Sequence, residues 1–454
     1  MSLAAINRLI QLFADAFAQL GHPIDMPRAE QLAMLVQRSM DHRRRVYHSS
    51  QHLFAMVPGM NARQTLATLF HDLVYYQLDG GFPTLLDHEL RRVARVDNGQ
   101  LSLRLIDRND WQLRLCAEVF GFAGGQTLSP YAGQNEFLSA VAAVRLLHEE
   151  LPPRELLAIV ACIEATIPFR GPDAHGRELS ERLWQRLRQS NRDFGCGADD
   201  GELECMVADA IDLANRDVAG FAEPDPAQFL ANTWLLIEES NAPQVESGVY
   251  SIHDYRQALA RMEGFLRTLK PEYIFHRDGV RPEAGEYAML VRAAGHNLDF
   301  ACAYLGCKLL SISIVEAFAQ LTGGDCPISM LLGDLRSSDG PPLRAEDLLP
   351  ELPAAADLNP ELLRVLQFGR ARESQNDLTA SPLSAYVYAA LGDAASRRIL
   401  GAAREMFAGT LTPQDFLAHF PGPIIDHLGQ ACAQISPSRR QLLQHWLAER
   451  HSAN

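Results

Sequence analysis

Two histidines four residues apart, His48 and His52, begin the part of the sequence whose side chains could bind a metal. About twenty residues later, His71 and Asp72 stand next to each other among apolar residues. Adjacent residues in a helix point about 100° apart, so both side chains cannot face solvent if the flanking residues form the core. A buried carboxylate needs a positive partner, which a divalent ion bound by imidazole nitrogen and carboxylate oxygen supplies. The pattern therefore indicates a metal site.

A third segment carries acidic residues that could complete this site. Asp209, Asp212 and Asp217 lie in residues 205–221, where apolar residues recur at helical spacing. Asp209 and Asp212 are three residues apart and share a helix face, and Asn215 follows on the same stretch. The alternative interpretation is a solvated acidic face with an internal Asp–Arg pair at four-residue spacing.

Helices are expected to position all these residues, because apolar residues recur at three- and four-residue steps almost throughout the chain. Ser49 or Ser50 is expected to cap a helix that holds His52 in its first turn. The His71-Asp72 pair is expected inside an apolar helix. No extended strand pattern is found, so we predict an all-α fold. The helical pattern is clear in Arg28–Arg44, Ala140–Leu147, Leu156–Thr166, Cys205–Phe221, Phe229–Glu238 and Tyr255–Leu269.

The length and composition are those of a globular protein with more than one domain. The chain has 454 residues, of which 47% are hydrophobic and 21% are charged. Segments rich in Pro, Asp and Gly at residues 277–286 and 333–359 signal boundaries. We predict a metal-binding domain over residues 1–280 and a smaller helical region of unknown role over residues 285–454. Its apolar stretch Leu309–Phe318 is either core or a surface for a homodimer.

The net charge and the cysteines limit which binding partners and which cellular compartment are expected. The net charge of −15 argues against non-specific binding to nucleic acid or to an anionic membrane. Eight cysteines without a Cys-x-x-Cys pair are typical of a reducing compartment. The N-terminus lacks the pattern of a signal peptide, and the longest apolar run is too short to span a bilayer. We expect a cytoplasmic protein without membrane contact.

Three segments together resemble the HD superfamily of metal-dependent phosphohydrolases. The first is similar to cyclic-nucleotide phosphodiesterases and to a group of small bacterial predicted HD phosphohydrolases. In the bacterial group, the His-Asp pair is also followed by Val and Tyr, and an Asn-Glu-x-x-Ser-Ala segment comes later. The matching residues are Tyr47-His48-Ser-Ser-Gln-His52, Phe70-His71-Asp72, Val74-Tyr75, Asn135-Glu136-Phe-Leu-Ser139-Ala140 and Ile211-Asp212-Leu-Ala-Asn215.

The resemblance implies an HD-domain-like helical bundle with a divalent metal ion (Mn, Zn, Fe, Ni or Mg) held between helices. By motif position, the ligands are His52, His71, Asp72 and Asp212. Asp72 would also orient a nucleophilic water, and His48 would protonate the leaving alkoxide, a role that suits a pKa near neutrality. The implied reaction is hydrolysis of a phosphate ester or phosphodiester in a small phosphorylated molecule, possibly a nucleotide.

Three further residues are candidates for binding that substrate. Arg45 ends a run of three arginines just before His48, and Arg170 lies in a predicted loop. A guanidinium binds phosphate through two parallel hydrogen bonds, which suits both arginines to this role. Asn215 is the last residue of the segment that resembles the HD motif.

Two other functions are consistent with the same residues. One is a catalytically silent binding or regulatory module that keeps the helical fold, because a fold does not guarantee activity. The other is a metal-dependent lyase or oxygenase, which a redox-active iron pair would favour. The chain lacks the His-Asp-x-x-Glu-Asp segment of guanosine tetraphosphate hydrolases and the Gly-Tyr-Pro segment of cyclic-di-GMP phosphodiesterases.

Overall fold

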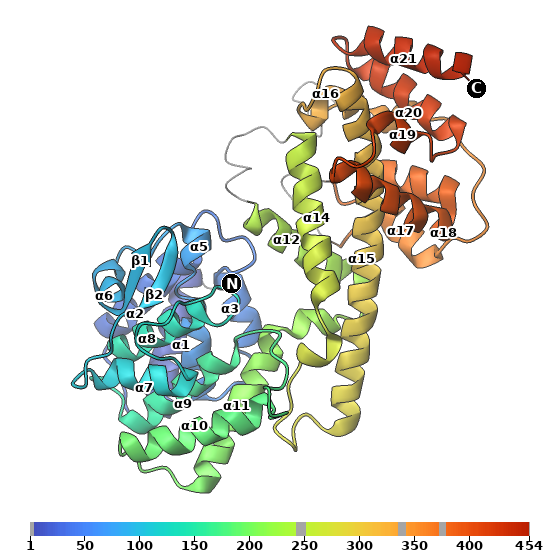
Figure 1. The fold of residues 1–454 in the computed structure, drawn as a ribbon. Helices are drawn as coiled ribbons and strands as arrows, with labels where there is room; N and C mark the ends of the chain where they lie inside the picture. Colours follow the sequence, from blue (N-terminus) through green and yellow to red (C-terminus); the bar gives the residue numbers. More distant parts are fainter. Residues whose placement is uncertain (1–3, 242–250, 335–341, 372–377, 454) are drawn as a thin grey trace. The chain divides into compact units, whose positions relative to one another are not determined.

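A computed structural model describes residues 4–241, 251–334, 342–371 and 378–453 of the chain (Figure 1). Helices dominate it, which confirms the predicted all-α class. The chain divides into two compact units, whose segments alternate along the sequence, whereas the sequence predicted one boundary between residues 280 and 285. The first unit comprises Met1–Ala222 and Lys270–Gly295, and the second comprises Glu223–Leu269 and His296–Asn454.

The first unit is built around the helix α9 (Pro153–Ala165), which is buried from Leu156 to Ala165. An apolar run of this kind is typical of a helix covered on all sides, and α9 packs against α4, α7, α8, α10 and α11. The other elements of this unit are α1 (Ala5–Gln19), α2 (Met26–Met40), α3 (Ser50–Met56), α4 (Ala62–Phe70), α5 (Tyr76–Asp79), α6 (Asp87–Val93), α7 (Trp111–Phe120), α8 (Gln134–Leu147), α10 (Leu179–Asp193), α11 (Asp200–Asp217), and the 3-10 helices η1 (Ala219–Ala222) and η2 (Pro271–Tyr273).

A small hairpin interrupts the helices of the first unit, contrary to the prediction of no strands. Strands β1 (Ala94–Asp97) and β2 (Gln100–Leu103) are antiparallel, with Ala94 opposite Leu103. The turn between them is Asn98-Gly99, and both residues have positive φ, 50° and 78°. Asn-Gly is the dipeptide that favours this two-residue turn, because both positions need the left-handed conformation.

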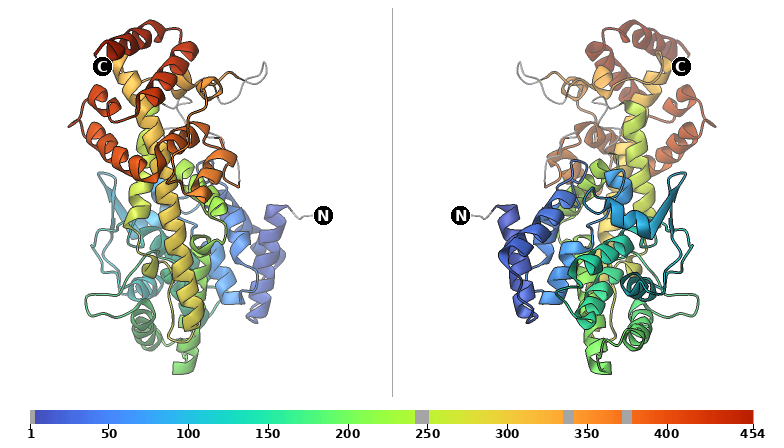
Figure 2. Two further views of the ribbon diagram at one scale, coloured as in Figure 1. Left: turned by 90° about the vertical axis from the view of Figure 1, so that its right-hand side faces the viewer. Right: turned by 90° about the vertical axis from the view of Figure 1, so that its left-hand side faces the viewer.

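The second unit contains two long helices, α14 (Ile252–Thr268) and α15 (Ala284–Leu321), of which α15 enters the unit at His296. They run side by side, as both views of Figure 2 show, and the Arg256 guanidinium donates to the buried Glu316 carboxylate at 2.8 Å. The remaining elements are α12 (Pro226–Ser240), α16 (Ile328–Leu332), η3 (Ala345–Leu348), α17 (Pro360–Phe368), α18 (Pro382–Phe407), α19 (Pro413–Leu417), α20 (Gly422–Ile435) and α21 (Arg440–Ala453).

The helix α15 corrects one prediction about the apolar segments. Among the described residues it is long and apolar enough to cross a bilayer, whereas the longest apolar run of the sequence, Leu309–Phe318, was predicted to be too short. Its most apolar window is 83% buried by the rest of the chain. A buried core helix of a soluble protein has the same length and composition, so this helix is weak evidence for a membrane span. Leu309–Phe318 is buried in the second unit.

Candidate metal centre

The first histidines lie at the start of α3. His52 is the third residue of this helix, and His48 lies just before it. Ser49 occupies the N-cap position but makes no side-chain cap hydrogen bond. The Ser50 hydroxyl instead donates to Asp41 Oδ1 at 2.7 Å, so neither serine caps the helix as the sequence predicted. This hydrogen bond ties the start of α3 to the end of α2 and fixes where His52 points.

The His-Asp pair follows the helix α4 rather than lying inside it. The helix begins with a reciprocal capping box between Asn61 and Gln64 and ends at Phe70, so His71 is its C-cap residue. His71 Nδ1 lies 2.8 Å from the carbonyl oxygen of Thr68. A carbonyl oxygen only accepts, so Nδ1 must carry the proton. This hydrogen bond orients the ring and leaves Nε2 to face the other site residues, as in metal-binding histidines.

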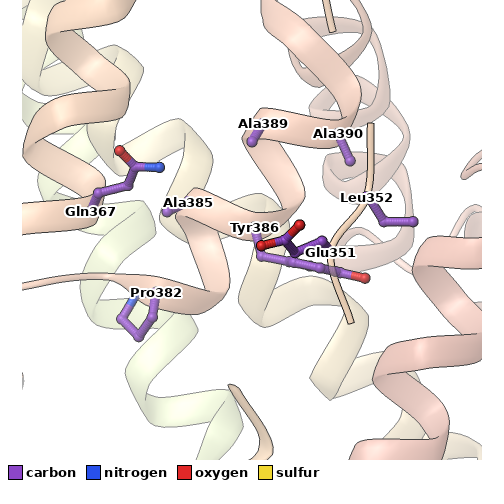
Figure 3. A pocket seen from close by; sticks show the side chains of 8 residues that line it. All are labelled: Glu351, Leu352, Gln367, Pro382, Ala385, Tyr386, Ala389 and Ala390. Atoms are coloured by element: carbon purple, nitrogen blue, oxygen red, sulfur yellow. The ribbon is translucent and has the colours of Figure 1, made fainter. Parts of the chain in front are cut away.

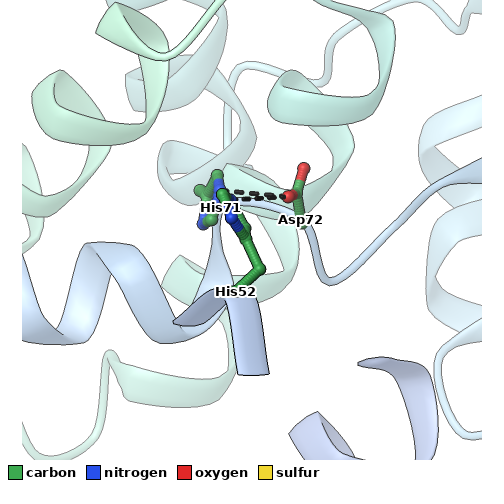
Figure 4. Close-up of side chains that lie close together, drawn as sticks. All are labelled: His52, His71 and Asp72. Carbon is green, nitrogen blue, oxygen red and sulfur yellow. Dashed lines mark ion pairs between the residues drawn. The ribbon is translucent and has the colours of Figure 1, made fainter. Parts of the chain in front are cut away.

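Three predicted ligands come together (Figure 4). One ligand atom from each of His52, His71 and Asp72 lies within 4.8 Å of the others. Asp72 Oδ2 is 3.0 Å from His71 Nε2 and 4.0 Å from His52 Nε2. Ligand atoms at about 2.0–2.2 Å from one ion lie roughly 3–4 Å apart, so this spacing fits a divalent metal with only small adjustments.

The fourth side chain of this cluster is that of Asp217, not that of the predicted Asp212. Asp217 Oδ1 lies 3.0 Å from His52 Nε2 and 3.5 Å from His71 Nε2. Asp212 Oδ2 accepts hydrogen bonds from Gln64 Nε2 and Arg216 Nε, both at 2.9 Å, and its side chain is 48% exposed. The two aspartates are five residues apart on α11, so they point about 140° away from each other.

Two atoms of this cluster lack the hydrogen-bond partner that buried polar groups normally have. His71 Nε2 and Asp72 Oδ2 are both buried without one, because their 3.0 Å contact does not have hydrogen-bond geometry. An imidazole nitrogen and a carboxylate oxygen are suitable ligands for Zn, Mn, Fe or Ni. The residues present therefore fit a divalent metal ion, which His52, His71, Asp72 and Asp217 could hold.

The charges in the cluster stabilise one another strongly. Burial opposes the charged form of His71, but the carboxylates of Asp72 and Asp217 outweigh burial and raise the pKa of His71 well above its ordinary value. Burial also opposes both ionised aspartates, yet the histidines lower the pKa of Asp72 far below its usual range and that of Asp217 to about 2. The cluster thus holds two carboxylates that require compensating positive charge.

His48 lies beside this cluster, as the sequence predicted. Its ring centroid is 6.0 Å from that of His52 and 5.0 Å from that of Tyr75, against which it packs edge to face. The positive charge of His48 also contributes to the lowered pKa of Asp72. A side chain at this place could exchange a proton with a molecule bound at the cluster.

Arg45 is buried, and it contacts Asp79 and the backbone of Asp72. Its side chain has no exposed surface, and its guanidinium binds both carboxylate oxygens of Asp79 at 2.9 and 2.6 Å. Arg45 Nη1 also donates to the backbone carbonyl of Asp72 at 2.6 Å. These contacts hold the backbone of the His71-Asp72 pair in place, so the structure supports a positioning role in place of the predicted substrate contact.

Asn215 also has a structural partner in place of the predicted substrate. Its amide donates to the carbonyl of His276 at 2.9 Å and accepts from the His276 N–H at 2.8 Å. This pair joins α11 to the segment after η2. Arg170 is partly exposed, and its guanidinium binds the buried carboxylate of Glu164, with Nη1 to Oε1 at 2.7 Å.

The segment Asn135–Ala140 was part of the resemblance, but the sequence assigned it no task. In the structure it supports the backbone that follows Asp72. Asn135 Oδ1 accepts from the Tyr76 N–H at 3.2 Å, and Ser139 Oγ accepts from the Val74 N–H at 2.9 Å. The residue between them, Glu136, has a buried Oε2 without a hydrogen-bond partner.

The surroundings of Glu136 keep a large share of its carboxyl groups protonated near neutral pH. Burial is the largest cause, and the negative charges of Asp72 and Asp217 add to it, while Arg170 opposes them. Together they raise the pKa of Glu136 to about 7. The charges of Asp72, Asp217 and Arg170 therefore all act on Glu136.

This raised pKa predicts how the stability of the metal-free protein depends on pH. The ionised carboxyl of Glu136 is disfavoured only in the folded state, so the wild type loses stability as the pH rises from about 4.5 through 7. Glu136→Gln removes this loss. We expect the variant to be more stable than the wild type by about 2–3 kcal/mol at pH 8, with little difference from it at pH 5.

Urea unfolding with a chelator present measures this difference in stability. Glu89→Gln is the control, because the Glu89 side chain is exposed. An equal difference at both pH values would contradict it.

Two cavities in the described part of the chain lie away from the cluster of His52, His71, Asp72 and Asp217. In the second unit, a cavity of about 370 Å³ is lined by three alanines, Tyr386, Pro382, Gln367, Leu352 and Glu351 (Figure 3). In the first unit, a cavity of about 320 Å³ lies between α6 and α8 and includes Arg145 and His148. Neither is lined by a residue of the cluster.

No protein-family model, curated protein or solved structure significantly matches this chain.

Proposed function

We propose that this protein is a metal-dependent phosphohydrolase that hydrolyses a phosphate ester or phosphodiester. One observation carries the proposal: His52, His71, Asp72 and Asp217 converge, and two of their buried ligand atoms have no hydrogen-bond partner. The motif resemblance of His48, His52, His71 and Asp72 adds support. We extend the proposal to a small phosphorylated substrate, such as a nucleotide, and to a cytoplasmic location.

The proposed roles follow from the positions of the side chains. A divalent ion held by the four ligands would lower the pKa of a bound water and neutralise charge on the phosphoryl group. The Asp72 carboxylate, buried and fixed by the backbone contact of Arg45, would accept a hydrogen bond from the attacking water. His48, packed against Tyr75, would donate a proton to the leaving alkoxide.

The proposal is tested by turnover of a phosphoester panel after reconstitution with Mn, Zn, Fe, Ni or Mg. We expect hydrolysis that depends on the metal. His48→Asn is expected to lower kcat by roughly 100-fold or more while the metal content stays that of the wild type, because general acid catalysis contributes about that much. His88→Asn is the control, since His88 is exposed on α6.

Two results would contradict the proposal. Full metal occupancy without turnover of any ester would favour a silent binding module. Two bound iron ions with oxygen consumption would favour an oxygenase on the same scaffold.

A further inference from the structure

An arginine cluster surrounds one buried carboxylate in the first unit. Glu164, at the end of α9, is completely buried and accepts hydrogen bonds from Arg170 Nη1 at 2.7 Å and Arg186 Nη2 at 2.9 Å. Arg182 lies one turn before Arg186 on α10, and its Nη2 donates to the carbonyl of Gly171 at 3.2 Å. Three guanidinium groups thus gather around a single acidic side chain.

The positive charge of this cluster is not balanced within the described residues. Glu164 already binds Arg170 and Arg186, and no ion pair of Arg182 is found in the described part of the chain. The nearby Asp173 pairs with Arg177 at 2.8 Å. Arg182 Nε is buried without a hydrogen-bond partner. A cation of this kind costs stability unless an anion approaches it.

The electrostatics of the neighbouring groups agree with an excess of positive charge. Burial lowers the pKa of Arg182, and the charges of Arg170 and Arg186 lower it further. His276 is also affected: burial and then the charge of Arg170 lower the pKa of its imidazole to about 4. His276 is therefore neutral at pH 7 and adds no charge. One guanidinium neutralises the Glu164 carboxylate, so the three arginines carry two positive charges in excess of it.

The arginine cluster adjoins the candidate metal centre. The charge of Arg170 acts on Glu136, and so do the charges of Asp72 and Asp217. The loop that carries Arg170 also packs beside the end of α11, where Asp217 lies, because the rings of Phe169 and Phe221 are 5.4 Å apart. All these elements belong to the first unit.

We propose that Arg182, with Arg170 and Arg186, forms a subsite for a second, non-scissile phosphate group of the substrate. This inference rests on the proposed function and narrows it to phosphate esters that carry a further phosphate. Two excess positive charges suit a dianion, and the guanidinium fork matches phosphate oxygens. The subsite holds one end of the substrate, and the metal ligands face the phosphoryl group that reacts.

Binding of inorganic pyrophosphate to the metal-free protein, measured by calorimetry with a chelator present, tests the subsite without turnover. We expect the wild type to bind and Arg182→Ala to bind at least roughly tenfold more weakly, because a hydrogen bond to a charged group is lost. Arg188→Ala is the matched control on α10, since Arg188 is half exposed, and it should bind like the wild type. Arg182→Gln keeps the side chain as far as Cδ with a polar end, and it replaces the alanine variant if that variant does not fold.

The outcomes distinguish this inference from the proposed function. Absence of binding in the wild type, or equal binding by the wild type and the Arg182 variant, overturns the subsite. Metal content measured on the same preparations is independent of this result. A protein that binds metal but no pyrophosphate thus loses only the subsite.

Discussion

Asp217→Ala is expected to lower the affinity for a divalent metal by roughly 100-fold or more. Loss of an outer-shell partner alone typically costs 10–100-fold, and Asp217 contacts both histidines directly, at 3.0 and 3.5 Å. The same change at Asp212 should leave the affinity within about twofold, because Asp212 pairs with Arg216 on the exposed side of α11. The two variants remove the same group from the same helix, five residues apart.

Metal affinity is measured by competition with a chelating dye, and circular dichroism checks that both variants remain folded. Comparable losses in the two variants would mean that charge on α11, rather than a defined ligand, attracts the ion. A loss in Asp212→Ala alone would restore the ligand set that the sequence implied and would contradict the arrangement described here.

Arg45→Ala should be among the most destabilising single changes near the site, at about 3–5 kcal/mol. The change leaves the carboxylate of Asp79, whose side chain is only 10% exposed, without its guanidinium partner. It also removes the hydrogen bond to the carbonyl of Asp72. The ion pair between Arg91 and Asp87 is exposed, so Arg91→Ala should change the free energy of unfolding very little.

Urea unfolding of the two single variants measures this difference. The double variant Arg45→Ala with Asp79→Asn should recover part of the loss, because the uncompensated buried charge is then removed. A cost for Arg45→Ala close to that of Arg91→Ala would show that Arg45 does not hold the backbone of Asp72 as described.

The histidines of the candidate metal centre could be predicted because their signal is local. His52 and the His71-Asp72 pair stand at fixed spacing in short segments, and the structure brings them together. The helical periodicity likewise located six helices, namely α2, α8, α9, α11, α12 and α14, although α8 and α11 begin five or six residues before the predicted ranges. The Asn98-Gly99 turn also carries a local signal for a hairpin, which was not predicted.

The remaining parts depend on tertiary packing, which the sequence does not encode locally. Asp209, Asp212 and Asp217 all lie on one helix, and only the approach of His52 and His71 selects Asp217. The burial of Arg45 depends on Asp79, 34 residues away. The segment Lys270–Gly295 returns to the first unit, and its contact between His276 and Asn215 carries no motif.

The central claim is most directly tested by one titration, in which metal is removed with a chelator and restored stepwise while bound metal and phosphoester hydrolysis are measured together. We expect hydrolysis to rise in proportion to bound metal and to stop rising when the site of His52, His71, Asp72 and Asp217 is saturated. His71→Ala should show neither binding nor turnover under the same conditions. Hydrolysis that survives chelation, or that persists in His71→Ala, would contradict the assignment of the reaction to this site.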